Sequence, residues 1–159
     1  MTNEERFVKL DRMRYTKNSL SSSLALLAIV FDVLFFVSIY QSNVGTYYYT
    51  ILMGASVLYN LIFMLMAFLS SEGVKNYKPG YSWLLAALGV GQIVRIFILP
   101  VQAHAAMIKN VPVMGDPQFI YVVVCLCISA VCCFASAVIN LIKSRQLAEH
   151  IASLDKQAA

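Results

Sequence analysis

Charge is scarce in this chain of 159 residues: only 13% of them are Asp, Glu, Lys or Arg, whereas 60% are hydrophobic. So few polar side chains cannot cover the surface of a soluble globule of this length. Long polar segments are missing as well, because short connections separate four apolar runs of about 20 residues, the length that crosses about 30 Å of hydrocarbon. The sequence therefore predicts an all-α, polytopic membrane protein, with four transmembrane helices in one bundle and no separate soluble domain.

The motifs that carry common enzyme chemistry are also missing. There is no H-E-x-x-H metal motif, no glycine-rich phosphate loop, no run of carboxylates, and no Ser, His and Asp that the spans could bring into one layer. The cysteines cluster in one apolar run. Four spans with clustered cysteines loosely resemble the membrane thiol oxidoreductases of the vitamin K epoxide reductase type. The C-x-x-C pair that is essential in those enzymes is missing from this chain. We therefore expect a protein that is not an enzyme and needs no metal or cofactor.

Lys and Arg are unevenly distributed over the polar segments, and this predicts the orientation. Outside the apolar runs, they fall before the first run, between the second and third, and after the fourth; the other two connections hold only Lys109. Basic residues collect on the cytoplasmic side of membranes. We therefore expect a multi-pass protein of the cell membrane with both termini cytoplasmic. The net charge of +4 follows from this bias and gives no reason to expect nucleic acid as a partner.

The apolar runs divide the chain into three parts. Residues 1–18 repeat apolar side chains among basic ones, which predicts a cytoplasmic amphipathic segment. Residues 143–159 repeat apolar side chains at Leu147, Ile151 and Leu154, which predicts a cytoplasmic helical tail. Between them lies the predicted four-helix transmembrane domain, residues 19–142, with spans at about 20–40, 46–69, 83–101 and 119–142.

Two opposite charges lie inside the predicted spans, where a charge costs about 2.5 to 3.5 kcal/mol on insertion scales. Counted back from the outer ends of the first and third spans at 1.5 Å per residue, Asp32 lies about 12 Å deep and Arg95 about 9 Å deep. Gln92 lies close to the depth of Asp32. We predict an intramembrane ion pair of Asp32 and Arg95, with Gln92 and a backbone carbonyl freed by Pro100 as further partners.

The predicted pair has several possible roles. It either fastens the first span to the third or takes part in gating or proton coupling. Alternatively, Arg95 reaches the outer headgroups while Asp32 faces another subunit or is protonated.

Small residues accompany both charges along their helices. They recur every three or four residues, which places them on one face, and such faces let helices approach closely. The predicted helix-packing residues, including a stripe on span four, are Ala25, Ala28, Ala87, Gly91, Cys125, Ser129, Cys133 and Ala137. The rings of the first span, at Phe31, Phe35, Phe36 and Tyr40, are predicted to face lipid. Asn60 lies in a different layer, about 21 Å deep, where its amide needs a partner on a neighbouring helix.

Two functions are consistent with these features. The leading hypothesis is a non-enzymatic accessory or stabilising subunit of a larger membrane complex, with a transporter as the favoured complex, because small stripes occur on several helices. The alternative is a homo-oligomeric transporter or channel for an ion or small solute that uses Asp32 and Arg95. A sensor or scaffold is a third hypothesis that the sequence does not separate from the first. The expected partners are the lipid bilayer, other integral membrane subunits and further copies of this chain.

Overall fold

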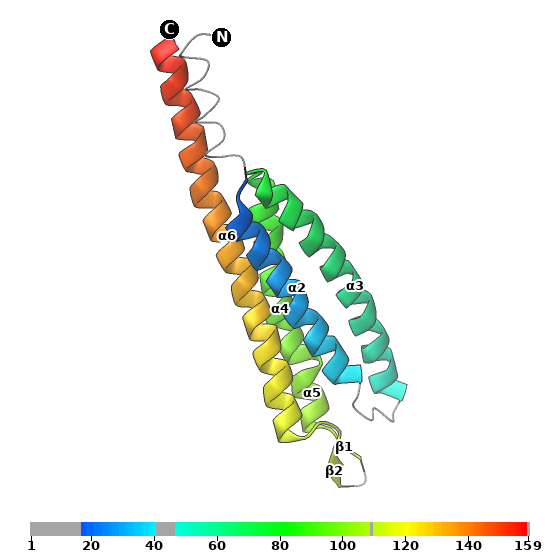
Figure 1. Cartoon of the computed structure of the whole chain (residues 1–159). Helices are drawn as coiled ribbons and strands as arrows, with labels where there is room; N and C mark the ends of the chain where they lie inside the picture. The colour runs from blue at the N-terminus through cyan, green and yellow to red at the C-terminus, as the bar shows by residue number, and fades with distance from the viewer. Residues whose placement is uncertain (1–16, 41–46, 109, 159) are drawn as a thin grey trace.

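The computed structural model describes residues 17–40, 47–108 and 110–158. Its four long helices are α2 (Ser19–Tyr40), α3 (Tyr47–Lys75), α4 (Gly80–Ile98) and α6 (Asp116–Ala158) (Figure 1). Between α4 and α6 lie the short helix α5 (Pro100–Ala105) and an antiparallel pair of two-residue strands, β1 (Met107–Ile108) and β2 (Val111–Pro112). The amphipathic segment predicted for residues 1–18 lies outside the described residues, apart from its last two.

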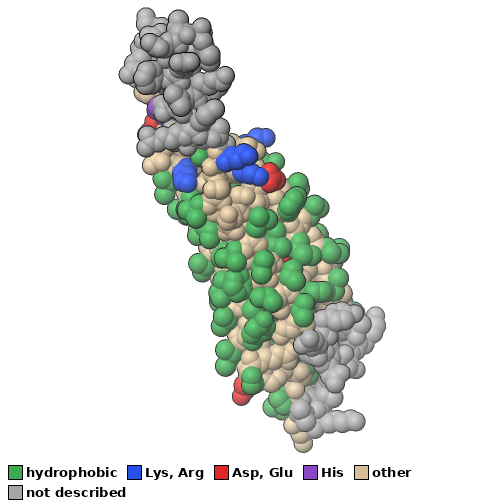
Figure 2. Space-filling view, in the orientation of Figure 1, with side chains coloured by type: hydrophobic (Ala, Val, Ile, Leu, Met, Phe, Trp, Pro, Cys, Tyr) green, Lys and Arg blue, Asp and Glu red, His purple; other side chains and the backbone are tan. Residues whose placement is uncertain are grey.

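Four helical segments are long and apolar enough to cross a membrane, with α4 and α5 together forming one of them. The predicted all-helical architecture is thus confirmed, apart from the short strand pair. Large hydrophobic side chains cover the sides of the bundle (Figure 2), as expected for lipid contact. Basic side chains gather at one end, which we call the basic end: Lys17, Lys75, Lys78, Lys143 and Arg145. We call the opposite end, which carries β1 and β2, the hairpin end.

Helix α3 continues six residues beyond the predicted end of the second span, to Lys75. Hydrogen bonds hold this extra part: the Ser70 hydroxyl donates to the Met66 carbonyl, and the hydroxyls of Ser71 and Ser22 lie 2.8 Å apart across α3 and α2. The helix ends where Tyr77 adopts a left-handed backbone conformation with φ of 58°. The connection between the second and third predicted spans, which end and begin at residues 69 and 83, is therefore mostly helical and contains only a tight turn.

Proline marks the end of α4, as the sequence predicts. Helix α4 ends at Ile98, and Pro100 opens α5, where its missing amide proton costs no helical hydrogen bond. At the other boundary, α6 shows no break near residue 142, where the span was predicted to end. It is one helix of 43 residues, so the predicted tail continues the fourth span.

Helices α2 and α4 lie diagonally opposite each other, because each packs mainly against α3 and α6. The contact between α2 and α6 is the most extensive, and that between α3 and α4 is much sparser. Small side chains make the close α2–α6 contact possible, and serines link the two backbones. The Ser129 hydroxyl donates to the Ala28 carbonyl at 2.9 Å, and Ser21 and Ser136 each donate to the other's carbonyl at 2.6 Å.

The bundle interior holds two apolar clusters. The basic-end core contains Ala25, Ala28, Phe63, Ala67, Val74, Leu85, Cys132, Cys133 and Ala137. The hairpin-end core contains Phe35, Ile39, Leu99, Ala103, Met114, Val122, Cys125 and Leu126. Asp32 falls between these cores along α2, and Gln92 and Arg95 fall between them along α4. The polar residues therefore form a separate layer, which we call the polar layer: Asp32, Ser56, Gln92 and Arg95.

Asn140 of α6 ties three parts of the chain together at the basic end. Its amide nitrogen donates to the Ser82 hydroxyl at 2.7 Å and to the Lys78 carbonyl at 3.1 Å, and its oxygen accepts from the Asn18 amide at 3.2 Å. Asn140 is fully buried. The start of α2, the α3–α4 turn and the start of α4 are thereby held against α6.

Candidate functional site

The ion pair lies in the polar layer and crosses the diagonal of the bundle. The Arg95 Nη1 on α4 lies 2.8 Å from the Asp32 Oδ1 on α2, and the Gln92 amide donates to the same oxygen at 2.9 Å. Asp32 and Gln92 are fully buried, and Arg95 is 5% exposed. The structure thus brings the three predicted residues together at the centre of the bundle. Their bonds link α2 to α4, two helices that otherwise contact each other little.

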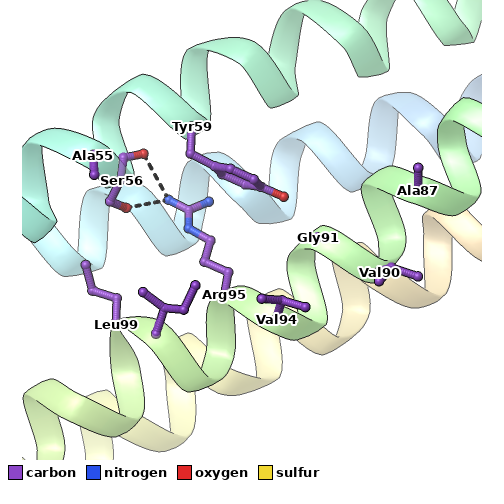
Figure 3. Close-up of a pocket in the computed structure, with 10 residues that line it drawn as sticks. Ala55, Ser56, Tyr59, Ala87, Val90, Gly91, Val94, Arg95 and Leu99 are labelled. Carbon is purple, nitrogen blue, oxygen red and sulfur yellow. Dashed lines mark hydrogen bonds between the residues drawn. The ribbon is translucent and has the colours of Figure 1, made fainter.

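Ser56 of α3 provides a further partner of Arg95. The Arg95 Nη2 donates to the Ser56 hydroxyl at 2.7 Å and to the Ser56 carbonyl at 3.3 Å (Figure 3). The sequence predicted a carbonyl freed by Pro100 in this role, but Nη2 is directed to α3 instead. Three of the four long helices therefore contribute polar atoms to one cluster. Hydrogen bonds to a charged group stabilise by about 1.5 to 3 kcal/mol, which offsets part of the cost of burying the guanidinium.

Aromatic rings flank the Arg95 guanidinium. Its Cζ lies 4.2 Å from the centroid of the Phe35 ring on α2 and 4.9 Å from that of the Tyr59 ring on α3. A cation within about 6 Å of a ring centroid is attracted to the ring face, by up to about 2 kcal/mol when desolvated. Phe35 is fully buried, so the prediction that it faces lipid is wrong. Its ring covers the cation instead.

Several buried polar atoms of this region have no hydrogen-bond partner among the described residues. They are the second carboxylate oxygen of Asp32, the amide oxygen of Gln92, the Nε of Arg95 and both side-chain atoms of Asn60. The partner that the sequence predicts for Asn60 on a neighbouring helix is therefore not formed within the described chain. Asn60 lies one helical turn from Ser56 on α3, so it borders the polar layer.

A groove of about 430 Å³ lies between α3 and α4, beside the polar layer (Figure 3). Arg95, Ser56 and Tyr59 line it together with small and branched apolar side chains, among them Ala55, Ala87 and Val94. Ala55 and Ala87 are exposed, so the groove opens to the side of the bundle. The Tyr59 hydroxyl reaches across to Gly91 of α4, where a Cβ would lie 2.5 Å from it.

The predicted helix-packing residues occupy two different environments. Ala25, Ala28, Cys125, Ser129, Cys133 and Ala137 are buried in the bundle, on α2 and α6. Ala87 and Gly91 instead line the groove between α3 and α4. The stripe on α4 therefore keeps open a space that a neighbouring helix does not fill. The difference arises because α3 diverges from α4 while α2 and α6 stay in close contact.

Ser56 and Tyr59 are the site residues that the sequence did not identify. For Ser56 the sequence contained one signal. Counted from the outer end of the second span, Ser56 lies about 15 Å deep, and the long side chain of Arg95, at a depth of about 9 Å, can reach that level. Which face of α3 turns inward could not be read, because core and lipid-facing side chains are similarly apolar.

The described helices contain no group of three or more His, Cys, Asp or Glu residues that could hold a metal ion. The four cysteines are free thiols, three of them buried and Cys127 exposed. The chemistry of the site is thus that of a buried, neutral ion pair beside an apolar groove. Comparison with family models, with curated proteins and with solved structures found no match.

Proposed function

We propose that the chain is a non-enzymatic accessory or stabilising subunit of a larger membrane complex, with a transporter as the favoured complex. The observation that supports this proposal best is the length of α6. Its 43 residues correspond to about 64 Å at 1.5 Å per residue, roughly twice the thickness of the hydrocarbon core. The helix extends well beyond the other three at the basic end (Figure 1). We call the part after residue 142 the arm.

The side chains of the arm suit contact with a protein. Leu147 and Ile151 follow each other at a spacing of four residues, on one face of the helix, and Ile151 is 50% exposed. Arg145 and Glu149 are exposed on other faces. An amphipathic helix that projects from a bundle offers its apolar row to a groove on a partner. The basic residues around the base of the arm support a cytoplasmic location for it and for both termini in the cell membrane.

Purification of the tagged protein from its native membranes in mild detergent tests the proposal. We expect a stoichiometric membrane partner to elute with the wild-type chain. The double substitution Leu147→Lys and Ile151→Lys should remove most of it, because two charges cannot enter an apolar groove. The same charge at Ala152, which is exposed on another side of the arm, is the control and should leave the partner bound. A wild-type chain that elutes alone, or a partner retained by the double variant, would contradict the proposal.

A homo-oligomeric transporter or channel is the second candidate, and one observation favours it. The unpaired oxygens of Asp32 and Gln92 are spare acceptors in the middle of the bundle, such as proton and ion pathways use. In this case the purified protein in liposomes should move protons or a small cation. Asp32→Asn should abolish the movement per folded molecule, and Glu72→Gln, at an exposed acid of the basic end, should not. Absence of flux from wild-type liposomes would rule out this candidate for the ions tested.

A further inference from the structure

The groove between α3 and α4 has the dimensions of a ligand site. Sites for small molecules typically enclose about 300 to 1,000 Å³, with mostly apolar walls and a few polar groups, and this groove of about 430 Å³ falls in that range. From Ala87 to Ile98 its α4 wall extends about 16 Å along the helix axis. The groove is therefore elongated and parallel to the expected direction of the lipid chains.

Small residues create this space. Ala55 on α3 and Ala87 on α4 leave the mouth of the groove wide, and both are exposed. Gly91 leaves room for the Tyr59 hydroxyl against α4, since a Cβ at that position would collide with it. The phenol therefore crosses the groove and forms part of its wall (Figure 3).

Two hydrogen-bond donors lie in the middle part of the groove wall. One is the Tyr59 hydroxyl; the other is the Arg95 guanidinium, which lines the groove while its side chain is more than nine-tenths buried. The Nε of Arg95 has no acceptor among the described residues, although its two terminal nitrogens have theirs. A donor left unpaired in an apolar region is costly, so an acceptor oxygen that a ligand brings to the guanidinium would be stabilised.

The charge of the site selects the ligand. Arg95 is already neutralised by Asp32 at 2.8 Å, so the polar layer carries no net charge. An anionic ligand would add an uncompensated negative charge in the apolar part of the bundle, whereas a neutral carbonyl would not. We propose that the α3–α4 groove binds a neutral lipid-soluble molecule, whose apolar body lies along α4 and whose carbonyl oxygen accepts hydrogen bonds from Tyr59 and Arg95. This inference does not depend on the proposed partner complex.

Photolabelling with benzophenone, a neutral lipid-soluble ketone, tests the inference on the full chain in phosphatidylcholine nanodiscs. We expect saturable labelling that peptide mass spectrometry maps to residues 55–59 and 87–99. Diphenylmethane, which has the same two rings but no oxygen, should compete about tenfold more weakly than unlabelled benzophenone, because it leaves the donors unpaired. The anion 4-benzoylbenzoate should also compete more weakly, because of its charge.

Two variants fill the groove from opposite walls and leave the residues of the ion pair unchanged. Ala87→Phe and Ala55→Phe each place a ring at an exposed position, and each should reduce the saturable labelling at least tenfold. Val131→Phe, on the exposed face of α6, is the matched control and should leave the labelling unchanged. The inference is overturned if labelling does not saturate and spreads over all exposed faces, if diphenylmethane competes as well as benzophenone, or if both groove variants label like the control.

Discussion

Replacing Arg95 with methionine is expected to lower the free energy of unfolding by about 3 to 5 kcal/mol, because the Asp32 carboxylate would stay buried without its cation. The loss should be large for this pair, since Asp32 is fully buried and has no other charged partner among the described residues. Unfolding by SDS in mixed micelles measures the change. Arg145→Met removes an exposed arginine from the arm and serves as the control, with an expected change below about 0.5 kcal/mol.

A double-mutant cycle separates the pair from its surroundings. Asp32→Leu alone should cost about as much as Arg95→Met, because it leaves the guanidinium unpaired. The combination of both should cost much less than the two separate losses, since a buried pair replaced by apolar side chains is often neutral. If Arg95→Met unfolds like Arg145→Met, or if the two losses simply add, the pair does not hold α2 to α4.

The exchanged pair Asp32→Arg with Arg95→Asp tests geometry beyond charge. It should recover folded protein relative to either single variant, since opposite charges again meet at the centre of the bundle. Recovery should be partial, because an arginine on α2 would no longer lie at the hydroxyl of Ser56 or between the rings of Phe35 and Tyr59. The amount of monodisperse protein after detergent extraction measures the recovery, and an exchange as poor as the single variants would contradict it.

The position of the polar layer explains why a structural role is the simpler interpretation of the pair. It separates two apolar cores and spans the diagonal between α2 and α4, which otherwise contact each other little. Apolar packing alone specifies the rotation of membrane helices poorly, because lipid is as apolar as the core. A charged pair that can be satisfied only across the diagonal fixes the rotation of both helices. Ser56 extends the same constraint to α3.

The sequence contained enough information to place the elements along the membrane normal. Apolar run length gave the four long helices, and counting residues from the span ends brought Asp32, Gln92 and Arg95 to one depth. Depth is readable because the rise per residue is constant. Rotation about the helix axis was not readable in the same way. Phe35 was therefore predicted on the lipid side, and Ala87 was predicted against a helix rather than on a groove.

The ends of the helices show a second limit of the sequence. Hydropathy indicates where the membrane ends, but a helix continues as long as its backbone is hydrogen-bonded. Polar contacts extend α3 to Lys75, beyond the predicted end of the second span at residue 69, whereas α6 continues into the helical tail that the sequence predicts. Such boundaries depend on side chains from distant segments, as the link between Ser71 and Ser22 shows.

Loss of the Asn140 hydrogen bonds is expected to have the second large effect on stability. Asn140→Leu should lower the free energy of unfolding by about 2 kcal/mol, because it removes hydrogen bonds to Asn18, Lys78 and Ser82, each worth roughly 0.6 kcal/mol on average between membrane helices. Unfolding by SDS measures this change, and Val138→Leu, at an exposed position two residues away, is the control. Equal unfolding of the two variants would contradict the prediction.

Proteolysis tests the same contact locally. The Asn140 amide holds the α3–α4 turn through the Lys78 carbonyl, and the Ser144 hydroxyl holds it through the Tyr77 carbonyl. Asn140→Leu removes the first of these hydrogen bonds, so the turn should open more often and trypsin should cut faster after Lys75. Cleavage on the arm, after Arg145, should stay unchanged, because no contact of Asn140 reaches it directly. A variant that is less stable globally but protected as well as wild type at Lys75 would show that the turn is held by other means.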